Sequence, residues 1–196
     1  LVNYGKVTAA WYTGGIVGKL VNDGASFCTN LGTVSGGEDT GGIVGCIDND
    51  DNSEGGISVY YCTNSGTVTA GRRALGGIAG YVESGSNNSK SVTFSKCYNT
   101  GTVSGTGTGS GDRDGMGGIV GEGKYSIVIE YCANKGTVTG SSGFHHIGGL
   151  AGYLGENSMG YDNYIYIKES FNSGTVEVTN ANANNTFVGG IAGHLE

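Results

Sequence analysis

Proline is absent from this chain of 196 residues and charged residues make up only 14%, whereas glycine is abundant, with 41 residues. A collagen triple helix is excluded, because it needs proline and a strict three-residue glycine period. Disorder is disfavoured, since hydrophobic residues reach 37% and isoleucine, valine and tyrosine recur at regular places. We therefore expect an ordered domain with a real core.

Positive charge is also scarce, with ten basic residues and a net charge of −7. Nucleic-acid binding is disfavoured, because phosphate contacts need clustered basic side chains and only Arg72 and Arg73 are adjacent. No apolar run approaches the roughly 20 residues needed for a membrane span. The chain opens in mid-motif without a recognisable leader, so we interpret it as a segment of a longer protein.

Common catalytic motifs are missing as well. The chain has no H-E-x-x-H, no G-x-S-x-G and no phosphate-binding G-x-x-x-x-G-K-[ST]. Polysaccharide-cleaving β-helices group acidic or basic residues on one face, and the only candidate for such a group is Asp112, Arg113 and Asp114 in the longest loop. We predict that the segment is not an enzyme.

A tandem repeat dominates what is present. The first block, Asn-x-Gly-x-Val, begins at Asn3, Asn30, Asn64, Asn99, Asn134 and Asn172. A second block, Gly-Gly-Ile/Leu-Val/Ala-Gly, follows each copy at 14–18, 41–45, 76–80, 117–121, 148–152 and 189–193. Successive asparagines lie 27, 34, 35, 35 and 38 residues apart. Six paired copies in one order indicate a repeat architecture.

The second block is predicted to form a strand, since alternate residues point to opposite faces. Its apolar column is predicted to face inward and comprises Ile16, Ile43, Ile78, Ile119, Leu150 and Ile191. Leu20 is predicted to share that face. The position before it holds Lys19, Cys46, Tyr81, Glu122, Tyr153 and His194, a mixture typical of a solvent-exposed face.

A third strand is predicted at 57–59, 92–94, 127–129 and 165–167, with a bulge or corner before the next cysteine. The pattern favours an all-β parallel β-helix or β-solenoid with about three short strands per turn and six Gly-rich repeats of about 35 residues. One repeat domain spans 1–196, with approximate turns 1–26, 27–60, 61–95, 96–130, 131–168 and 169–196. Helical repeats are disfavoured for want of helical periodicity. A propeller is the nearest rival, but it needs four strands per repeat.

Two further columns follow from the stacking. Inward asparagines are expected to pair with backbone groups at corners. Outward threonines are expected at Thr33, Thr67, Thr102, Thr137 and Thr175. Exposed threonine is a good strand former, and a hydroxyl ladder is also similar to ice-binding solenoids, which we keep as a remote alternative.

Four of the five cysteines share one repeat position: Cys28, Cys62, Cys97 and Cys132. Their spacing predicts a stacked column rather than the paired spacing of zinc sites. We expect buried, reduced thiols, with disulfides between turns as the alternative. The fifth, Cys46, is expected to be an exposed thiol.

Potential ligands for a cation are few. Asp48, Asp50, Asn52 and Glu54 alternate as in calcium loops, but the turn glycine and distal glutamate of an EF-hand are missing. The two alternatives for this segment are a calcium site and a solvated acidic loop, and we expect no other cofactor. Adjacent His145 and His146 would face opposite ways on a strand and chelate poorly.

The six Gly-Ile/Leu-Val/Ala-Gly copies with their Cys-x-Asn-x-Gly-x-Val blocks resemble the GLUG-motif repeats of bacterial surface proteins. The resemblance covers essentially the whole chain and implies an adhesin-like, secreted or cell-surface segment. GLUG repeats also accompany immunoglobulin A metallopeptidases, which implies a substrate-positioning role as the alternative. The expected partners are host glycan, host protein or neighbouring domains of the same chain. Tyr81, Tyr125 and Tyr153 are candidate exposed rings for sugar contacts.

Overall fold

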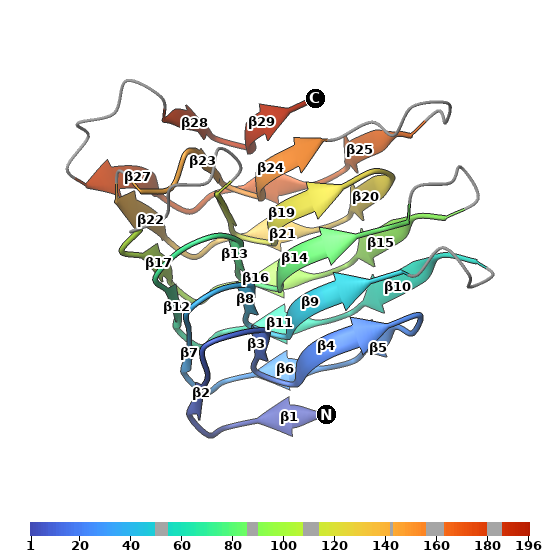
Figure 1. Cartoon of the computed structure of the whole chain (residues 1–196), viewed down its shortest axis with the longest axis horizontal. Coiled ribbons are helices and arrows are strands. Elements are labelled where there is room, and N and C mark those ends of the chain that lie inside the picture. The colour runs from blue at the N-terminus through green and yellow to red at the C-terminus, as the bar shows by residue number, and fades with distance from the viewer. Residues whose placement is uncertain (50–54, 86–89, 108–113, 142, 156–162, 180–185) are drawn as a thin grey trace.

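The computed structural model describes residues 1–49, 55–85, 90–107, 114–141, 143–155, 163–179 and 186–196. The regular structure in these ranges consists of 29 β-strands in five sheets (Figure 1). The described residues contain no helix that is long and apolar enough to traverse a bilayer.

Each sheet takes one strand from each successive turn. Sheet A contains β1 (Val2–Asn3), β6 (Thr29–Asn30), β11 (Thr63–Asn64), β16 (Tyr98–Asn99), β21 (Ala133–Asn134) and β26 (Phe171–Asn172). Sheet B contains β2 (Val7–Thr8), β7 (Val34–Gly36), β12 (Val68–Ala70), β17 (Val103–Gly105), β22 (Val138–Ser141) and β27 (Val176–Thr179). Sheet C contains β3 (Thr13–Gly14), β8 (Thr40–Gly41), β13 (Leu75–Gly76), β18 (Gly115–Gly117), β23 (His146–Gly148) and β28 (Phe187–Gly189). Sheet D contains β4 (Val17–Val21), β9 (Val44–Asp48), β14 (Ala79–Glu83), β19 (Val120–Lys124), β24 (Ala151–Gly155) and β29 (Ala192–Leu195). Sheet E contains β5 (Ala25–Ser26), β10 (Ile57–Tyr60), β15 (Val92–Ser95), β20 (Ile127–Glu130) and β25 (Ile165–Lys168).

The strands pair in parallel and in register, so equivalent residues of successive turns lie beside each other. Asn64 pairs with Asn30 and Asn99, and Val68 pairs with Val34 and Val103. The predicted parallel β-solenoid is therefore confirmed, with the chain passing from sheet A through B, C and D to E in each turn.

The number of strands per turn differs from the prediction, since the structure has about five rather than three. Each of the two repeat blocks contributes two strands instead of one. In the second turn the first block divides into β6 and β7, and the glycine block divides into β8 and β9. Segments of two or three residues are too short for alternation to reveal them.

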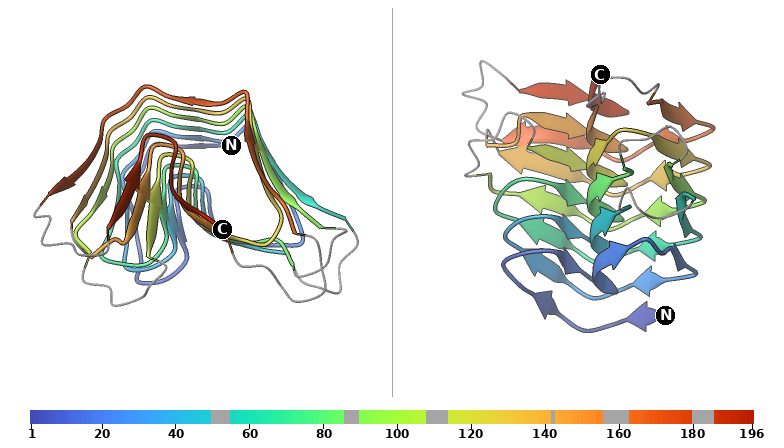
Figure 2. Two further views of the ribbon diagram at one scale, coloured as in Figure 1. Left: turned by 90° about the horizontal axis from the view of Figure 1, so that it is seen from above. Right: turned by 45° about the vertical axis from the view of Figure 1, so that its right-hand side comes forward.

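Viewed along the stack, each turn has the shape of an arch with two arms (Figure 2). Sheet A forms the roof, sheets B and C form one arm, and sheets D and E form the other. Sheets C and D converge on an apex that points back toward sheet A. The chain therefore turns inward at the glycine block.

The apex packs against a ladder of asparagine side chains below sheet A. Asn30 Nδ2 donates to Asn64 Oδ1 at 2.8 Å and to the carbonyl of Gly32 at 2.9 Å, and the same pair of bonds recurs at the other turns. A Cβ added at Gly15 would lie 2.7 Å from Asn30 Cγ. In the first five blocks the second glycine therefore leaves room for the asparagine of the next turn.

Each arm has its own apolar core. Sheets D and E enclose the larger cluster, and sheets B and C enclose the smaller one, which includes Leu75, Met116 and Ile147. The predicted aliphatic column lies in the larger cluster and is fully buried at Ile43, Ile78, Ile119 and Leu150. Ile16 is half-buried and Ile191 is exposed, because the terminal turns have a neighbour on one side only.

The corner predicted before the cysteine column lies between sheets E and A. Its residues are in the left-handed region, with φ of 52° at Phe27, 51° at Tyr61, 54° at Lys96, 53° at Tyr131 and 49° at Glu169. Bulky residues seldom adopt this region. At each of these positions a single residue changes the direction of the chain. Its side chain points outward, so a row of large side chains lies at the edge of sheet E.

Candidate functional site

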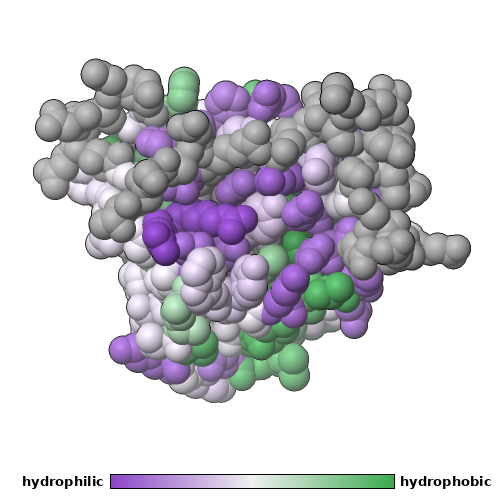
Figure 3. Space-filling model, viewed as in Figure 1, coloured by the Kyte–Doolittle hydropathy of each residue, from purple (hydrophilic) through white to green (hydrophobic). Residues whose placement is uncertain are grey.

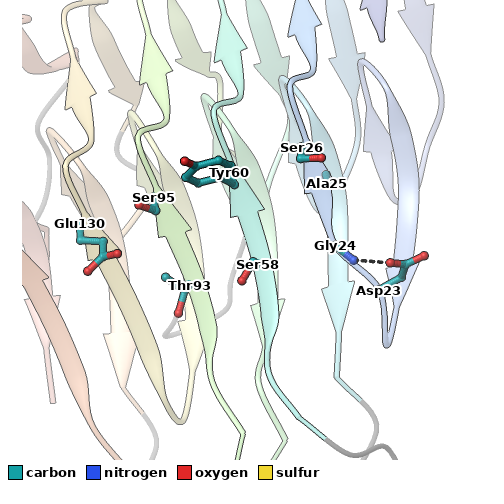
Figure 4. A pocket seen from close by; sticks show the side chains of 9 residues that line it. All are labelled: Asp23, Gly24, Ala25, Ser26, Ser58, Tyr60, Thr93, Ser95 and Glu130. Atoms are coloured by element: carbon teal, nitrogen blue, oxygen red, sulfur yellow. Dashed lines mark hydrogen bonds between the residues drawn. The ribbon is translucent and has the colours of Figure 1, made fainter.

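The outer face of sheet E contains a cavity of about 550 Å³ (Figure 4). Side chains from four successive turns line it, so it runs along the axis of the stack. Its lining residues are Asp23, Gly24, Ala25, Ser26, Ser58, Tyr60, Thr93, Ser95 and Glu130. We call this cavity the sheet E groove.

Strand register explains how these residues meet. Tyr60 pairs with Ser26 on one side and Ser95 on the other, and Ser95 pairs with Glu130. Ser58 pairs with Thr93 in a second row on the same face. The alternating residues Ile57 and Val59 point into the core and are buried. Alternation thus places hydroxyl groups outward on β5, β10 and β15, and a carboxylate outward on β20.

Aromatic rings support one side of the groove. Phe27 and Tyr61 stack with ring centroids 5.3 Å apart, and Tyr60 contacts Tyr61 edge-to-face at 4.3 Å. Lys96 Nζ lies 4.9 Å from the Tyr61 centroid and 5.7 Å from that of Tyr60. These contacts restrain the Tyr60 ring at the centre of the groove.

The groove carries negative rather than positive charge. Of the residues that the structure describes, two charged ones line the groove, Asp23 and Glu130, at opposite ends. Asp23 Oδ1 accepts a hydrogen bond from the amide of Gly24 at 2.7 Å, and Glu130 Oε2 lies 3.0 Å from Lys168 Nζ.

The outer face of sheet D is a second surface, and the prediction of solvent exposure is confirmed there at Lys19 but is wrong at the four inner positions, while His194 is half-buried. Cys46, Tyr81, Glu122 and Tyr153 are all buried, with Cys46 only 4% exposed. Cys46 and Tyr81 form a small apolar cluster with Ala74, which precedes β13 of sheet C. The inward turn at the apex brings the outer faces of sheets C and D together. We call this contact the C–D seam.

Glycine allows the seam to close. A Cβ added at Gly80 of β14 would lie 2.5 Å from the backbone nitrogen of Thr40 in β8. Gly45 stands in the same relation to Thr13 at 2.5 Å. In sheet D this glycine has no paired residue in the neighbouring strands, whereas the residues on either side of it do. The alternation of inward and outward side chains is therefore interrupted at the glycine and resumes one residue later. That phase change places Val44 and Ile47 in the core while Cys46 enters the seam.

One charged side chain reaches across the seam: Arg73, just before β13 of sheet C, contacts Tyr81 of sheet D and also pairs with Asp39, which precedes β8 of sheet C. Arg73 Nε lies 3.2 Å from Asp39 Oδ1, and the Arg73 guanidinium lies 4.6 Å from the centroid of Tyr81. Tyr81 donates its hydroxyl to Glu83 Oε2 at 2.7 Å. Figure 3, which shows the face onto which sheets C and D open, has its hydrophilic side chains gathered over the middle of that face.

Burial changes the titration of two groups in the seam. Burial raises the pKa of the Asp39 carboxyl to about 6, although Arg73 opposes the rise. Within the described residues neither Asp39 oxygen has a hydrogen bond of good geometry, and the side chain is 1% exposed. Burial raises the pKa of the Cys46 thiol to about 12. The expected exposed, titratable thiol is therefore corrected to a buried, protonated one.

The four stacked cysteines Cys28, Cys62, Cys97 and Cys132 are buried and free. Their thiols donate to backbone carbonyls, for example Cys97 Sγ to Val59 O at 3.4 Å and Cys132 Sγ to Glu130 O at 3.2 Å. The column therefore fills the corner between sheets E and A as small polarisable side chains.

The calcium candidates are only partly placed. Asp50, Asn52 and Glu54 lie outside the described residues. Asp48 is an ion-pair partner of Lys19, with Nζ and Oδ2 2.9 Å apart. No group of three or more metal-binding side chains occurs in the part of the chain that the structure describes.

The remaining candidates are dispersed. His146 is buried in an aromatic group with Tyr153, Phe187 and His194, and its ring stacks on Phe187 at 5.3 Å. Tyr125 is half-buried, whereas Tyr81 and Tyr153, expected to be exposed, are buried. Asp112 and Arg113 lie outside the described residues, and Asp114 is buried. The threonine column faces outward and is exposed at Thr33, Thr67, Thr102 and Thr175 and half-buried at Thr137.

The residues of the sheet E groove were not predicted as a site. The alternation of 57–59 and 92–94 already places Ser58 and Thr93 outward. The missing information was that Asp23, in the loop before β5, and Glu130, at the end of β20, lie at the two ends of the same face.

No protein-family model matches the chain, and no curated protein or solved structure shows a significant match to it. The resemblance to GLUG-motif repeats is therefore still a prediction from the motif.

Proposed function

We propose that this chain is a non-catalytic, adhesive repeat segment of a secreted or cell-surface bacterial protein. The sheet E groove is its contact surface, and the stacked turns are the rigid support that holds this surface. The observation that carries the proposal is the groove itself, a cavity of about 550 Å³ with polar side chains and one aromatic ring on the outside of the solenoid. Concave surfaces with a few convergent polar groups are the usual places for ligands.

The scaffold suits display rather than motion. Successive turns pair through five sheets, except that the last turn pairs through four, and the asparagine ladder joins the turns through the interior. A solenoid of this kind supports an elongated surface on which the same strand position recurs at each turn.

A binding survey tests the proposal. The immobilised chain is expected to bind at least one member of a panel of purified glycans and extracellular matrix proteins with saturable kinetics. Ser58→Arg fills the groove from an exposed strand position and is expected to abolish that binding without a change in melting temperature.

The matched control is Tyr166→Ala, which removes an exposed ring from the same sheet outside the groove. It is expected to leave binding intact. Absence of saturable binding to every member of the panel would contradict the adhesive role and leave a spacer.

A further inference from the structure

We infer that the sheet E groove binds an uncharged oligosaccharide whose chain runs along the solenoid axis, across β5, β10, β15 and β20. The inference rests on the proposed function and specifies the ligand class of the same groove. It depends on three features of the groove: its polar groups, its charge and its direction.

The polar groups suit sugar hydroxyls. Ser58, Thr93 and Ser95 present hydroxyl groups that both donate and accept hydrogen bonds. The carboxylates of Asp23 and Glu130 are acceptors, and one carboxylate accepts from two adjacent donors. Vicinal hydroxyl groups of a pyranose present such a pair of donors.

The aromatic ring suits the apolar face of a sugar. Tyr60 lies in the middle of the groove, between Ser26 and Ser95 in the strand register (Figure 4). The axial C–H groups of a pyranose pack on such a ring, and the rim of hydroxyls hydrogen-bonds around it. Because Phe27 and Tyr61 already contact Tyr60, little freedom of the ring is lost on binding.

The charge argues against an anionic ligand. Among the described residues no arginine or lysine lines the groove, whereas a carboxylate lies at each end. Lys168 is engaged with Glu130 at 3.0 Å, and Lys96 lies over the rings of Tyr60 and Tyr61. Sulfate, phosphate or a sialic acid carboxylate placed in the groove would be repelled by Asp23 and would find Lys168 already paired with Glu130.

The direction follows from the stacking. The groove crosses four strands, and neighbouring strands lie about 4.8 Å apart, so the two carboxylates are separated by roughly 14 Å along the axis. One strand spacing is close to the length of one pyranose in an extended chain. The groove therefore fits a short oligosaccharide better than a monosaccharide.

The test uses the whole chain and a panel of uncharged tetrasaccharides built from glucose, mannose, galactose or N-acetylglucosamine. The same backbones carrying sulfate or sialic acid form the second arm. At least one uncharged tetrasaccharide is expected to bind saturably and more tightly than its monosaccharide, and its charged counterpart to bind more weakly. Glycans of bacterial and of animal origin in the panel separate the two possible sources.

Three variants assign the binding to the groove. Tyr60→Ala is expected to lower the affinity for the tetrasaccharide at least about tenfold. Tyr60→Phe is expected to keep the affinity within about threefold of the wild type, because the sugar contacts the ring rather than the hydroxyl. Glu130→Gln is expected to reduce the difference in affinity between uncharged and sulfated ligands. Tyr166→Ala is the control, and melting curves show that each variant is folded.

The possible failures are distinguishable from those of the proposed function. Saturable binding only to sulfated or sialylated glycans, or only to protein, would overturn this inference and leave the adhesive role standing. Binding of an uncharged tetrasaccharide that Tyr60→Ala does not weaken would also overturn it, because the ligand would lie elsewhere. Absence of binding to every glycan and every protein would overturn both.

Discussion

The outer faces of sheets D and E have the same kind of alternating sequence but opposite environments. On sheet E, Ser58 is exposed, Thr93 and Tyr60 are half-buried, and all three line an open groove. On sheet D, Tyr81 and Glu122 are buried against sheet C. The difference arises because each turn folds inward at its glycine block. Alternation therefore separates the two faces of a strand but does not establish which face meets solvent.

The chemistry of the two surfaces differs accordingly. The C–D seam pairs its charges internally, as in Arg73 with Asp39 and Lys19 with Asp48. In the sheet E groove the hydroxyl groups face solvent. The first surface holds the arch closed, and the second presents groups to a ligand.

The largest effect is expected from adding a methyl group in the seam. Gly80→Ala would place Cβ 2.5 Å from the backbone nitrogen of Thr40 and 2.7 Å from the carbonyl oxygen of Gly45. Backbone atoms cannot yield as a flexible side chain does, so we expect a loss of about 3 kcal/mol or more in the free energy of unfolding. Urea denaturation measures it.

The control for this change is Gly71→Ala. The nearest atom to a Cβ at Gly71 is the carbonyl oxygen of Gly37, at 3.9 Å. This variant is expected to remain within about 0.5 kcal/mol of the wild type. If Gly80→Ala lowered the free energy of unfolding as little as Gly71→Ala does, the seam would not be closely packed.

A smaller effect is expected from removing rings. Tyr81→Ala removes a buried ring, its hydrogen bond to Glu83 and its contact with Arg73, so we expect a loss of about 3 kcal/mol. Tyr166→Ala on sheet E removes a ring that is 56% exposed and should cost about 0.5 kcal/mol or less. Thermal or urea unfolding of the pair measures the contrast, and a small loss at Tyr81 would place that ring in solvent.

The third effect depends on pH, and the variant that tests it is expected to change the free energy of unfolding less than the two seam variants do. In the folded chain the pKa of Asp39 is raised from 3.8 to about 6, so the folded state holds this proton more tightly than the unfolded state. The group therefore lowers the free energy of unfolding as pH rises from about 4 to about 6, by up to roughly 3 kcal/mol. Asp39→Asn removes the charge and should stabilise the chain by about 1–2 kcal/mol at pH 7.5, with little effect at pH 4.

Urea titrations of both proteins between pH 4 and pH 8 measure this difference. Asp48→Asn is the matched control, since Asp48 is a partly exposed partner of Lys19. An Asp39→Asn variant that is less stable at pH 7.5 would show that the pair with Arg73 outweighs the cost of burial.

Much of the fold follows from the sequence because its columns repeat. Six copies of the asparagine and glycine blocks predict stacked turns, and the buried column at Ile43, Ile78, Ile119 and Leu150 occupies the interior. What could not be predicted is the path of each turn. Strands as short as Thr40–Gly41 carry no alternation, and the phase change at glycine positions such as Gly80 is invisible in the residue pattern.

The same limit applies to the site. Sequence reasoning placed exposed tyrosines on sheet D, at Tyr81 and Tyr153, where the structure buries them. It did not identify Tyr60, the last residue of β10, which lies one residue beyond the predicted strand at 57–59. Which tyrosine is accessible depends on the fold of the arch, and that depends on contacts between strands rather than on the residues of one strand.

Thiol labelling of the native chain tests the difference between the two faces most directly. All five cysteines are buried, and Cys46 in the seam is 4% exposed with a pKa of about 12, whereas Ser58 on sheet E is exposed. An aromatic disulfide reagent should label none of the five native cysteines at neutral pH and one thiol per chain in Ser58→Cys, with all five native thiols reacting after denaturation. Native labelling of Cys46 at the rate of the introduced thiol would contradict the closed seam and the inward path of every turn.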